Sequence, residues 1–409
     1  MQWFYRCPAC GARYEIEPGR YLCTPCSKLQ QQNRPLAGVL EVEWEGEADP
    51  RSAPLPIEPK WFAPIPVGQT PLWAPLRLRE EFGAPHLWLK DDTCNPSGSF
   101  KDRASWLVAA FAKKHGVKEI VLASTGNAAS SMAAVGAAAG LRIKVFLPAK
   151  APLAKRIQVL QYGAELVAVD GTYDQAFDLS LDYSRSSGSL SRNTAYNPLT
   201  IEGKKTVAFE IVDDLQRVGS GAPDHVFVPV GDGVILAGVY RGFENLLRLG
   251  RIKKVPTVWA CQAEGSSAIA RALASPLAGN DAFGDPVSSN TLADSISVDV
   301  PRNGLYALGK LKEYAGKAVT VSDDEILAAQ RKLASSTGLF AEPSSSAAFA
   351  GWLKVRQGLS ADETCVLLIT GSGLKDIAAA ARGLDILGSE PSSLRCADPT
   401  PKTLQGNTK

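Results

Sequence analysis

Short apolar runs alternate with alanine-rich stretches from about residue 86 onward, and this alternation limits the possible folds more than any other feature. Runs such as EIVLAS (119–124) and HVFVPV (225–230) have the length and composition of buried strands. Stretches such as VILAGVYRGFENLLRLG (234–250) have apolar residues at helical spacing. Strands that alternate with helices in this way predict parallel sheets with both faces covered, an α/β fold.

Length and composition are those of a globular protein with more than one domain. The chain has 409 residues, 45% of them hydrophobic, which exceeds what one core usually supports. The net charge is +2 and the basic residues are scattered, so nothing indicates a surface for nucleic acid or anionic membrane. The N-terminal sequence lacks the pattern of a signal peptide, and no apolar run reaches about 18 residues. We therefore expect a cytoplasmic protein that acts on small ligands.

Four of the eight cysteines lie close together near the N-terminus and predict a structural zinc site. They form the pairs CPAC and CTPC, which can place four thiolates at the corners of a tetrahedron, with residues 11–22 as a short hairpin between them. Because all four ligands would be thiolates, the metal would have no open position for catalysis. Two disulfides are the alternative, which a cytoplasmic location disfavours. The ligands would be Cys7, Cys10, Cys23 and Cys26.

The distribution of cysteine, proline and polar residues divides the chain into four parts. Residues 1–45 would form a zinc ribbon, 46–75 a proline-rich extended connector, and 76–385 the catalytic body. A smaller subdomain of about residues 104–195 would be inserted in the larger domain of that body. The polar residues 386–409 are expected to form a flexible tail.

Three glycine-bearing turns, at residues 124–130, 231–238 and 370–376, follow predicted strands. Ligands of open parallel sheets bind beyond the carboxyl ends of the strands, where helix N-termini present free N–H groups. Each turn alone is a weak signal, because glycine or asparagine is often needed there for backbone conformation. The second turn, GDGVILAG, suits a phosphate, since its glycines let backbone amides approach an anion. It lacks the P-loop and dinucleotide signatures, which favours a monophosphate.

Lys101 ends a stretch of small residues, NPSGSFK. A lysine is usually a solvated surface charge. Together with a turn that suits a monophosphate, however, it suggests pyridoxal phosphate, a cofactor held by a Schiff base to lysine and by its phosphate.

Several motifs, in order, resemble those of pyridoxal-phosphate enzymes of the tryptophan-synthase-β type (fold-type II), and within them the threonine synthases. The resemblance covers roughly residues 60–385 and rests on LWLKDDTCNPSGSFKDR, ASTGNAASS, NPLTIEGKKTVAFEI, PVGDGVILAG, AEPSSSAA and TGSGLKD. It implies two domains of open twisted sheets, a homodimer, and conversion of O-phospho-L-homoserine and water into L-threonine and phosphate. An N-terminal zinc ribbon is also frequent in bacterial and archaeal threonine synthases.

The resemblance also implies roles for single residues. Lys101 would be the Schiff-base lysine, and Asn127 would hydrogen-bond the ring hydroxyl of the cofactor. Thr370 would face the ring nitrogen; a hydroxyl there leaves that nitrogen largely unprotonated, which favours eliminations and replacements over transamination. The cofactor phosphate would lie against the backbone amides of Gly231, Asp232, Gly233 and Val234. Donors for the substrate carboxylate would be Ser97, Ser99, Ser124 and Thr125, although each is as often a turn or N-cap residue.

Asp102 and Arg103 directly follow Lys101 in the sequence. We expect them to form a charge pair at the start of a helix rather than to act in catalysis.

The chain departs from the family where the substrate phosphate binds. Threonine synthases usually have an arginine at the position of Thr200, and threonine cannot replace the charge of a bidentate arginine. Arg302, Lys204 or Lys205 could compensate, although exposed positions on a helix are the simpler expectation for the two lysines. The alternative function is therefore a pyridoxal-phosphate dependent β-elimination or β-replacement on another amino acid, as in serine/threonine ammonia-lyases or cysteate synthases.

A third reading is a zinc-ribbon protein that recruits a partner or binds nucleic acid through a catalytically inactive body. The intact SGSFKDR motif and the near-neutral charge argue against it.

Overall fold

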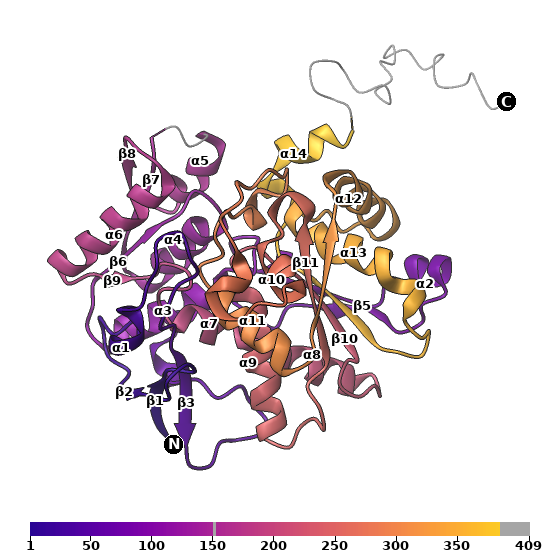
Figure 1. Cartoon of the computed structure of the whole chain (residues 1–409), viewed down its shortest axis with the longest axis horizontal. Helices are drawn as coiled ribbons and strands as arrows, with labels where there is room; N and C mark the ends of the chain where they lie inside the picture. The colour runs from indigo at the N-terminus through magenta and orange to yellow at the C-terminus, as the bar shows by residue number, and fades with distance from the viewer. Residues whose placement is uncertain (150–152, 385–409) are drawn as a thin grey trace, which may run out of the picture.

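Two sheets of mainly parallel strands, both packed against helices, form most of the molecule (Figure 1). The computed structural model describes residues 1–149 and 153–384. Within each sheet all neighbouring strands pair in parallel, except for one antiparallel pair at an edge of the larger sheet. The predicted α/β class is thus confirmed.

The larger sheet has six strands. Their order is β12 (Lys317–Val321), β11 (Thr257–Ala263), β10 (His225–Pro229), β13 (Cys365–Ile369), β5 (Leu87–Asp91) and β4 (Leu72–Trp73). Its strands read as continuous apolar runs because both faces are covered. Val226 and Val228 face the core that holds α8, α9 and α11, whereas Phe227 between them faces the core that holds α12 and α13. The helices of this part are α2 (Leu76–Phe82), α7 (Leu199–Glu202), α8 (Thr206–Arg217), α9 (Val234–Arg248), α10 (Ala268–Ala274), α11 (Gly304–Glu313), α12 (Asp323–Thr337), α13 (Pro343–Val355) and α14 (Ile377–Arg382).

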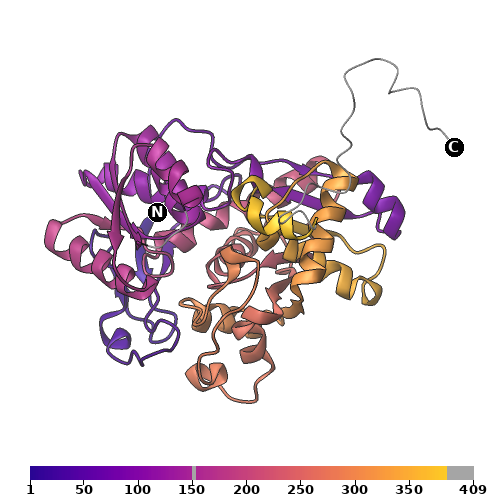
Figure 2. The same ribbon diagram turned by 90° about the horizontal axis from the view of Figure 1, so that it is seen from above.

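The smaller sheet has four strands, and it lies beside the larger one in both views (Figures 1 and 2). Their order is β8 (Glu165–Val169), β7 (Arg142–Pro148), β6 (Glu119–Ala123) and β9 (Leu190–Ser191). The helices here are α3 (Asp102–Lys114), α4 (Asn127–Ala139), α5 (Leu153–Gln161) and α6 (Tyr173–Ser187). Helix α4 packs closely on β7, since a Cβ at Gly136 would lie 2.3 Å from Cγ1 of Ile143. This close approach explains a glycine inside a helix.

The N-terminal segment forms a small antiparallel sheet of its own. It consists of β2 (Arg13–Tyr14), β1 (Gln2–Arg6) and β3 (Glu41–Glu45), with the short helix α1 (Thr24–Ser27) between β2 and β3. The hairpin predicted within residues 11–22 is wrong: β2 pairs with β1, and Leu22 bridges to Val39. The long β1 strand pairs on both sides, and residues 15–21 have no strand partner.

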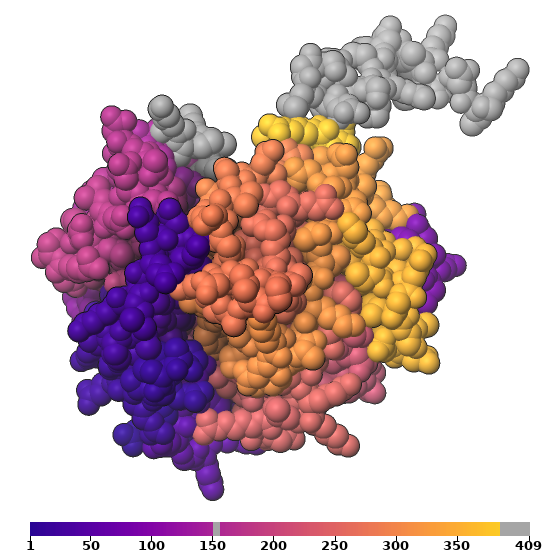
Figure 3. Space-filling model, viewed as in Figure 1, coloured from indigo at the N-terminus to yellow at the C-terminus, as the bar shows by residue number. Residues whose placement is uncertain are grey.

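The N-terminal sheet contacts both parts of the body. Tyr5 and Cys23 share an apolar cluster with Leu107 of α3 and Ile120 of β6. Arg241 of α9 donates a hydrogen bond to the carbonyl oxygen of Val42 at 2.7 Å. In the space-filling view the indigo N-terminal residues accordingly touch both the magenta and the orange regions (Figure 3).

Two sequence predictions concern segments outside the sheets. The proline-rich connector contributes β4 to the edge of the larger sheet, so it is not extended linker throughout. The predicted tail, residues 386–409, lies outside the described residues. Among the helices of the described ranges, none has both the length and the apolar character needed to cross a bilayer.

Candidate active site

The three glycine-bearing turns meet at a cavity of about 1010 Å³ between the two sheets. Its walls include the residues that follow β6, β10 and β13, which is where ligands of parallel sheets bind. The predicted site residues that line it are Lys101, Ser124, Thr125, Asn127, Gly231, Asp232, Gly233, Val234 and Thr370. Ser97, Ser99 and Thr200 are not among its lining residues.

Lys101 is held at the cavity by its position directly before α3. The N–H of its neighbour Phe100 donates to the carbonyl oxygen of Thr370 at 2.8 Å, which fixes this segment to the end of β13. Burial lowers the pKa of Lys101 below its usual value, and the nearby Arg192 lowers it further, while Glu342 and Asp232 oppose the shift. Within the described ranges its Nζ donates no hydrogen bond. The amine is therefore available to react with a ligand in the cavity, and its lowered pKa makes it easier to deprotonate.

The loop of Gly231 to Gly233 presents the N-terminus of α9 to the cavity. Gly233 has φ = +86°, a left-handed conformation that favours glycine. A Cβ at Gly231 would lie 2.8 Å from Cα of Ile296, so that position has no room for a side chain. No side chain caps the start of α9. This geometry suits an anion held by backbone N–H groups at a helix N-terminus.

Thr370 is positioned by Ser345, a residue that the sequence analysis missed. The Ser345 Oγ accepts hydrogen bonds from the backbone N–H of Thr370 and of Gly371, both at 2.7 Å. It also lies 2.8 Å from the Thr370 Oγ1. The threonine hydroxyl therefore has a fixed place at the end of β13. The motif AEPSSSAA contained Ser345, but nothing in its spacing singled out this serine.

Glu342 is a second residue to which the sequence analysis gave no role, and it lines the cavity. Its two carboxylate oxygens accept hydrogen bonds from the Asn127 Nδ2 at 3.1 and 3.0 Å. Burial raises the pKa of Glu342, and Asn127 and Lys101 oppose that shift. The Asn127 amide, which was expected to bind the cofactor, is thus also tied to a buried acid. The carboxyl group and Lys101 interact electrostatically, and both line the cavity.

Ser97 and Thr200 are buried and use their hydroxyl groups within the protein. The Ser97 Oγ donates to the Asp102 Oδ1 at 2.5 Å, and its backbone N–H donates to Oδ2 at 2.7 Å. The Thr200 Oγ1 donates to the carbonyl oxygen of Asn197 at 2.7 Å. Ser99 lies 3.4 Å from Ser97, oxygen to oxygen. These contacts hold the backbone around the cavity.

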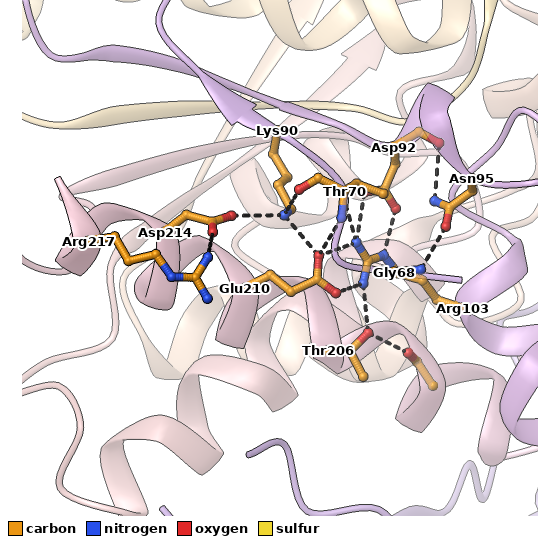
Figure 4. Close-up of polar contacts among 11 residues, drawn as sticks. Gly68, Thr70, Lys90, Asp92, Asn95, Arg103, Thr206, Glu210, Asp214 and Arg217 are labelled. Carbon is orange, nitrogen blue, oxygen red and sulfur yellow. Dashed lines mark hydrogen bonds and ion pairs between the residues drawn. The ribbon is translucent and has the colours of Figure 1, made fainter. Parts of the chain in front are cut away.

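The expected charge pair between Asp102 and Arg103 is wrong, because each has other partners. Asp102 binds Ser97, whereas Arg103 lies between the carboxylates of Asp92 and Glu210 at 2.6 and 2.5 Å (Figure 4). Lys90 extends this network to Glu210 at 2.8 Å. Consecutive residues of a helix point in different directions, so the two side chains separate.

The expectation that Lys204 and Lys205 are exposed is also wrong, since both are fully buried. Lys205 forms an ion pair with Glu202 and lies 5.6 Å from the ring centre of Trp44. Lys204 lines the cavity, and its Nζ donates to the carbonyl oxygen of Thr200 at 2.6 Å. The third candidate, Arg302, pairs with Asp174 of α6 across the cavity mouth.

Residues of the N-terminal segment also line the cavity, which no sequence signal indicated. They are Gln30, Gln31, Gln32, Asn33, Arg34 and Leu36, between the second cysteine pair and β3. The N–H of Leu36 donates to the carbonyl oxygen of Arg302 at 2.8 Å, and Arg34 lies 3.4 Å from Asp285. The cysteine-containing segment therefore contributes directly to the rim of the site.

The family and the relatives that the chain resembles agree with the chemistry of this cavity. The family model described as pyridoxal-phosphate dependent enzyme matches residues 64–371. The chain belongs to the pyridoxal-phosphate dependent enzyme family. Its sequence is 35% identical to the threonine synthase of Methanosarcina acetivorans over 91% of this chain and 92% of that protein. It is 32% identical to the threonine synthase of Methanocaldococcus jannaschii over 96% of each chain.

Solved structures of other proteins have the same fold as this chain. The threonine deaminase of T.th. superposes with a TM-score of 0.63 at 26% identity, covering 75% of this chain and 92% of that one. Maize serine racemase, at 20% identity, also has a TM-score of 0.63 over 75% and 88% of the two chains, and it shows the fold alone. The predicted fold-type II architecture is confirmed.

The residues of the cavity fit pyridoxal phosphate. Gly231 and Gly233 form a cradle that side chains would fill, at the uncapped start of α9, which suits the cofactor phosphate. Lys101 offers an amine for a covalent bond to the cofactor. Thr370 offers a fixed hydroxyl for a ring nitrogen. The chemistry of the donors therefore agrees with the family.

Proposed function

We propose that this chain converts O-phospho-L-homoserine and water into L-threonine and phosphate with pyridoxal phosphate as cofactor. The observation that carries the proposal is 32–35% identity to two threonine synthases over more than nine-tenths of the chain. The cavity supports it, because an amine with a lowered pKa and a cradle for an anion meet there.

The chain's own residues account for binding and proton transfer. Bound pyridoxal phosphate supplies an electron sink that makes the protons on Cα and Cβ of the substrate acidic. The Lys101 Nζ, whose pKa is lowered by burial, takes the proton from Cα and then serves at Cβ. Ser124 and Thr125 line the cavity and are proposed to hold the substrate carboxylate. Phosphate leaves from Cγ as a proton is taken from Cβ, Cγ then gains a proton to become the methyl group, the hydroxyl group of water is added at Cβ, and a proton returns to Cα.

The remaining site roles are proposed as the sequence predicts them. Asn127 and Thr370 would contact the cofactor ring. The backbone amides of Gly231, Asp232, Gly233 and Val234 would contact its phosphate. The sequence predicts direct substrate contacts for Ser97 and Ser99. Because Ser97, Ser99 and Thr200 are not lining residues, we propose instead that they act on the substrate through the backbone that they hold.

The alternative is β-elimination or β-replacement on another amino acid, of the serine/threonine ammonia-lyase or cysteate-synthase kind. One observation favours it: the Thr200 hydroxyl is engaged by Asn197, so this position offers no charge to a substrate phosphate.

The test compares two reactions of the purified holoenzyme. With O-phospho-L-homoserine we expect threonine and inorganic phosphate in equal molar amounts. With L-threonine we expect little 2-oxobutyrate. Rapid formation of 2-oxobutyrate without phosphate release from phosphohomoserine would replace the proposal by the alternative.

We also propose that the four N-terminal cysteines bind a structural zinc ion. Their Sγ atoms all lie within 4.8 Å of one another, with Cys7 to Cys26 at 3.8 Å and Cys10 to Cys23 at 3.5 Å. A tetrahedral zinc with Zn–S bonds of about 2.3 Å requires sulfur atoms about 3.8 Å apart. A disulfide requires about 2.05 Å, so these distances support the metal over the disulfide alternative.

The domain boundaries, assembly and location remain proposals as well. We propose a ribbon of residues 1–45, a connector of 46–75 and a catalytic body of 76–385 with an inserted subdomain of about 104–195. We also propose that the protein acts as a homodimer in the cytoplasm. Light scattering after size-exclusion chromatography tests the dimer, and a monomeric mass would exclude it.

A further inference from the structure

Two buried basic side chains beside the cavity have no carboxylate partner within residues 1–149 and 153–384. Lys204 is fully buried, and its Nζ donates one hydrogen bond, to the carbonyl oxygen of Thr200. Arg192 is also fully buried. Its Nη1 donates to the Thr194 Oγ1 at 2.6 Å and its Nε to the Ser105 Oγ at 3.3 Å, but its Nη2 has no hydrogen-bond partner. All of these acceptors are neutral.

Lys101, which lines the cavity and is proposed to bind the cofactor, likewise has no ion pair among the described residues. Every other buried lysine or arginine of the described chain has a carboxylate partner. They are Lys90, Arg103, Lys205, Arg241 and Lys310. A buried charge without a counter-charge is costly, which is why proteins pair such groups. The exception at Lys204 and Arg192 therefore indicates that the missing anion is a ligand.

The surroundings of Lys204 are predominantly positive. Burial lowers its pKa well below the usual value, and Arg192 and Lys101 lower it further. Asp232 is the acid that opposes this shift, but burial raises the pKa of Asp232 itself. Burial likewise lowers the pKa of Arg192 to about 10, and the nearby Asp102 and Tyr173 oppose this shift without forming an ion pair or hydrogen bond with it. An arriving anion would favour the charged form of the amine and remove this cost.

We propose that Lys204 binds the phosphate group of the substrate, with Arg192 as a second positive charge beside it. The inference rests on the proposed function. The glycine loop before α9 already offers backbone donors to the cofactor phosphate, so Lys204 is left for a second anion. Lys204 lines the cavity together with Lys101, whereas Thr200, one helical turn earlier, uses its hydroxyl on Asn197. Lysine thus supplies the charge that Thr200 lacks.

The test uses the Lys204→Gln holoenzyme, with Lys204→Arg as the variant that keeps the charge and Lys253→Gln as an exposed control. A hydrogen bond to a charged group supports a change of about 10- to 100-fold. We expect Lys204→Gln to raise the KM for phosphohomoserine and the Ki of inorganic phosphate by that factor. Lys204→Arg should recover most of the loss, and Lys253→Gln should match the wild type.

Two further readings separate the possible anions. The Kd of pyridoxal phosphate for the apoprotein and the spectral response of the holoenzyme to L-threonine, which carries no phosphate, should change less than about twofold, since a factor of two is only a few tenths of a kcal/mol. If the cofactor Kd rises as much as the KM, Lys204 binds the cofactor phosphate and the proposal is overturned. An unchanged KM overturns it too.

A measurement on the wild type makes the test independent of the variants. Because the amine of Lys204 is easily deprotonated, binding of dianionic phosphate should take up protons. Calorimetry in two buffers of different ionisation enthalpy measures this uptake, and its absence would count against the proposal. Failure of the proposed function is seen separately, as phosphate binding that depends on Lys204 in an enzyme that does not turn over phosphohomoserine.

Discussion

Two clusters of charged side chains near Lys101 differ in their balance of charge. In the first, Arg103 and Lys90 are surrounded by Asp92, Glu210 and Asp214 (Figure 4). In the second, Lys101, Lys204 and Arg192 meet beside the cavity with no ion pair among the described residues. Burial of charged side chains does not by itself indicate a functional site. Buried basic side chains that lack a counter-charge, as in the second cluster, do indicate one.

The balanced cluster has a structural task. Arg103, at the start of α3, joins Asp92, which follows β5, to Glu210 of α8. Thr70 of the connector also donates to Asp92 at 2.7 Å. The network therefore fixes the segment that carries Lys101 between the two sheets, while the second cluster is left to interact with ligands.

The largest effect is expected at the centre of the unbalanced cluster. Lys101→Ala should lower turnover by about 10²- to 10⁴-fold or more, because it removes the group that transfers protons. It should not reduce the free energy of unfolding of the apoprotein, since a buried amine with a lowered pKa is lost. Rates from phosphate release and urea unfolding measure both quantities. A variant that keeps wild-type turnover would exclude the proposed role of Lys101.

The balanced cluster should respond in the opposite way. Arg103→Met leaves Asp92 buried without a cation and Glu210 with Lys90 alone, which should cost about 3–5 kcal/mol of the free energy of unfolding. Urea denaturation of the apoprotein measures this loss. A change below about 1 kcal/mol, the size expected of an exposed ion pair, would show that the network does not hold the fold.

The pH dependence of stability should separate the clusters further. Arg103 and Lys90 lower the pKa of Glu210 from 4.5 to about 2, against the effect of burial. An acid whose pKa is lower in the folded state stabilises the fold at pH values above its unfolded pKa. This stabilisation is lost as the pH falls, here from about 4.5 towards 2. The loss should be about 1–3 kcal/mol in urea titrations across this range, and Glu210→Gln should remove it. A wild-type curve that is flat there would contradict the assignment.

Lys204 should contribute a cost to stability rather than a gain, although stability again rises with pH. Its pKa is lowered, so the unfolded chain binds more protons than the folded one, and stability rises with pH up to the ordinary lysine value of 10.5. The stability gained by Lys204→Met should therefore shrink as pH increases. Urea unfolding of both proteins at several pH values measures this gap, and a gap that widened with pH would contradict the direction of the shift.

The smallest effect is expected from the cysteine cluster. Cys10→Ser should reduce the zinc content of the purified protein, measured by atomic emission. Because residues 30–36 lie at the cavity rim, KM should change by a few-fold while kcat stays within about twofold, since these residues are remote from the proton transfer. A protein that contains no zinc before mutation would exclude the proposed metal.

Much of the fold could be predicted, because alternating apolar runs and glycine turns are local signals. The three turns that meet at the cavity follow from the rule for parallel sheets. The strand β12 and helices α6, α10 and α11 were not singled out, although α6 has a local signal in its capping box of Thr172 and Gln175.

The sequence did not indicate several residues of the site, and the physical reason is the same for each. Glu342 and the N-terminal lining residues reach the cavity from distant parts of the chain, Ser345 reaches the backbone of Thr370, and only the tertiary fold brings them there. Lys204 was expected to be an exposed helix residue because lysine side chains usually lie in solvent. Its burial against α9, where Gly238 leaves room for its Cβ, depends on a contact that the sequence pattern does not encode.

The free energy of unfolding of the Lys204→Met apoprotein, measured in urea beside Arg103→Met, tests the difference between the clusters most directly. If Lys204 is a buried amine kept without a counter-charge for a ligand, its replacement by an apolar side chain of similar size should leave stability unchanged or raise it. A loss of about 3 kcal/mol, like that expected for Arg103→Met, would show that Lys204 is part of the folded framework and would contradict the account.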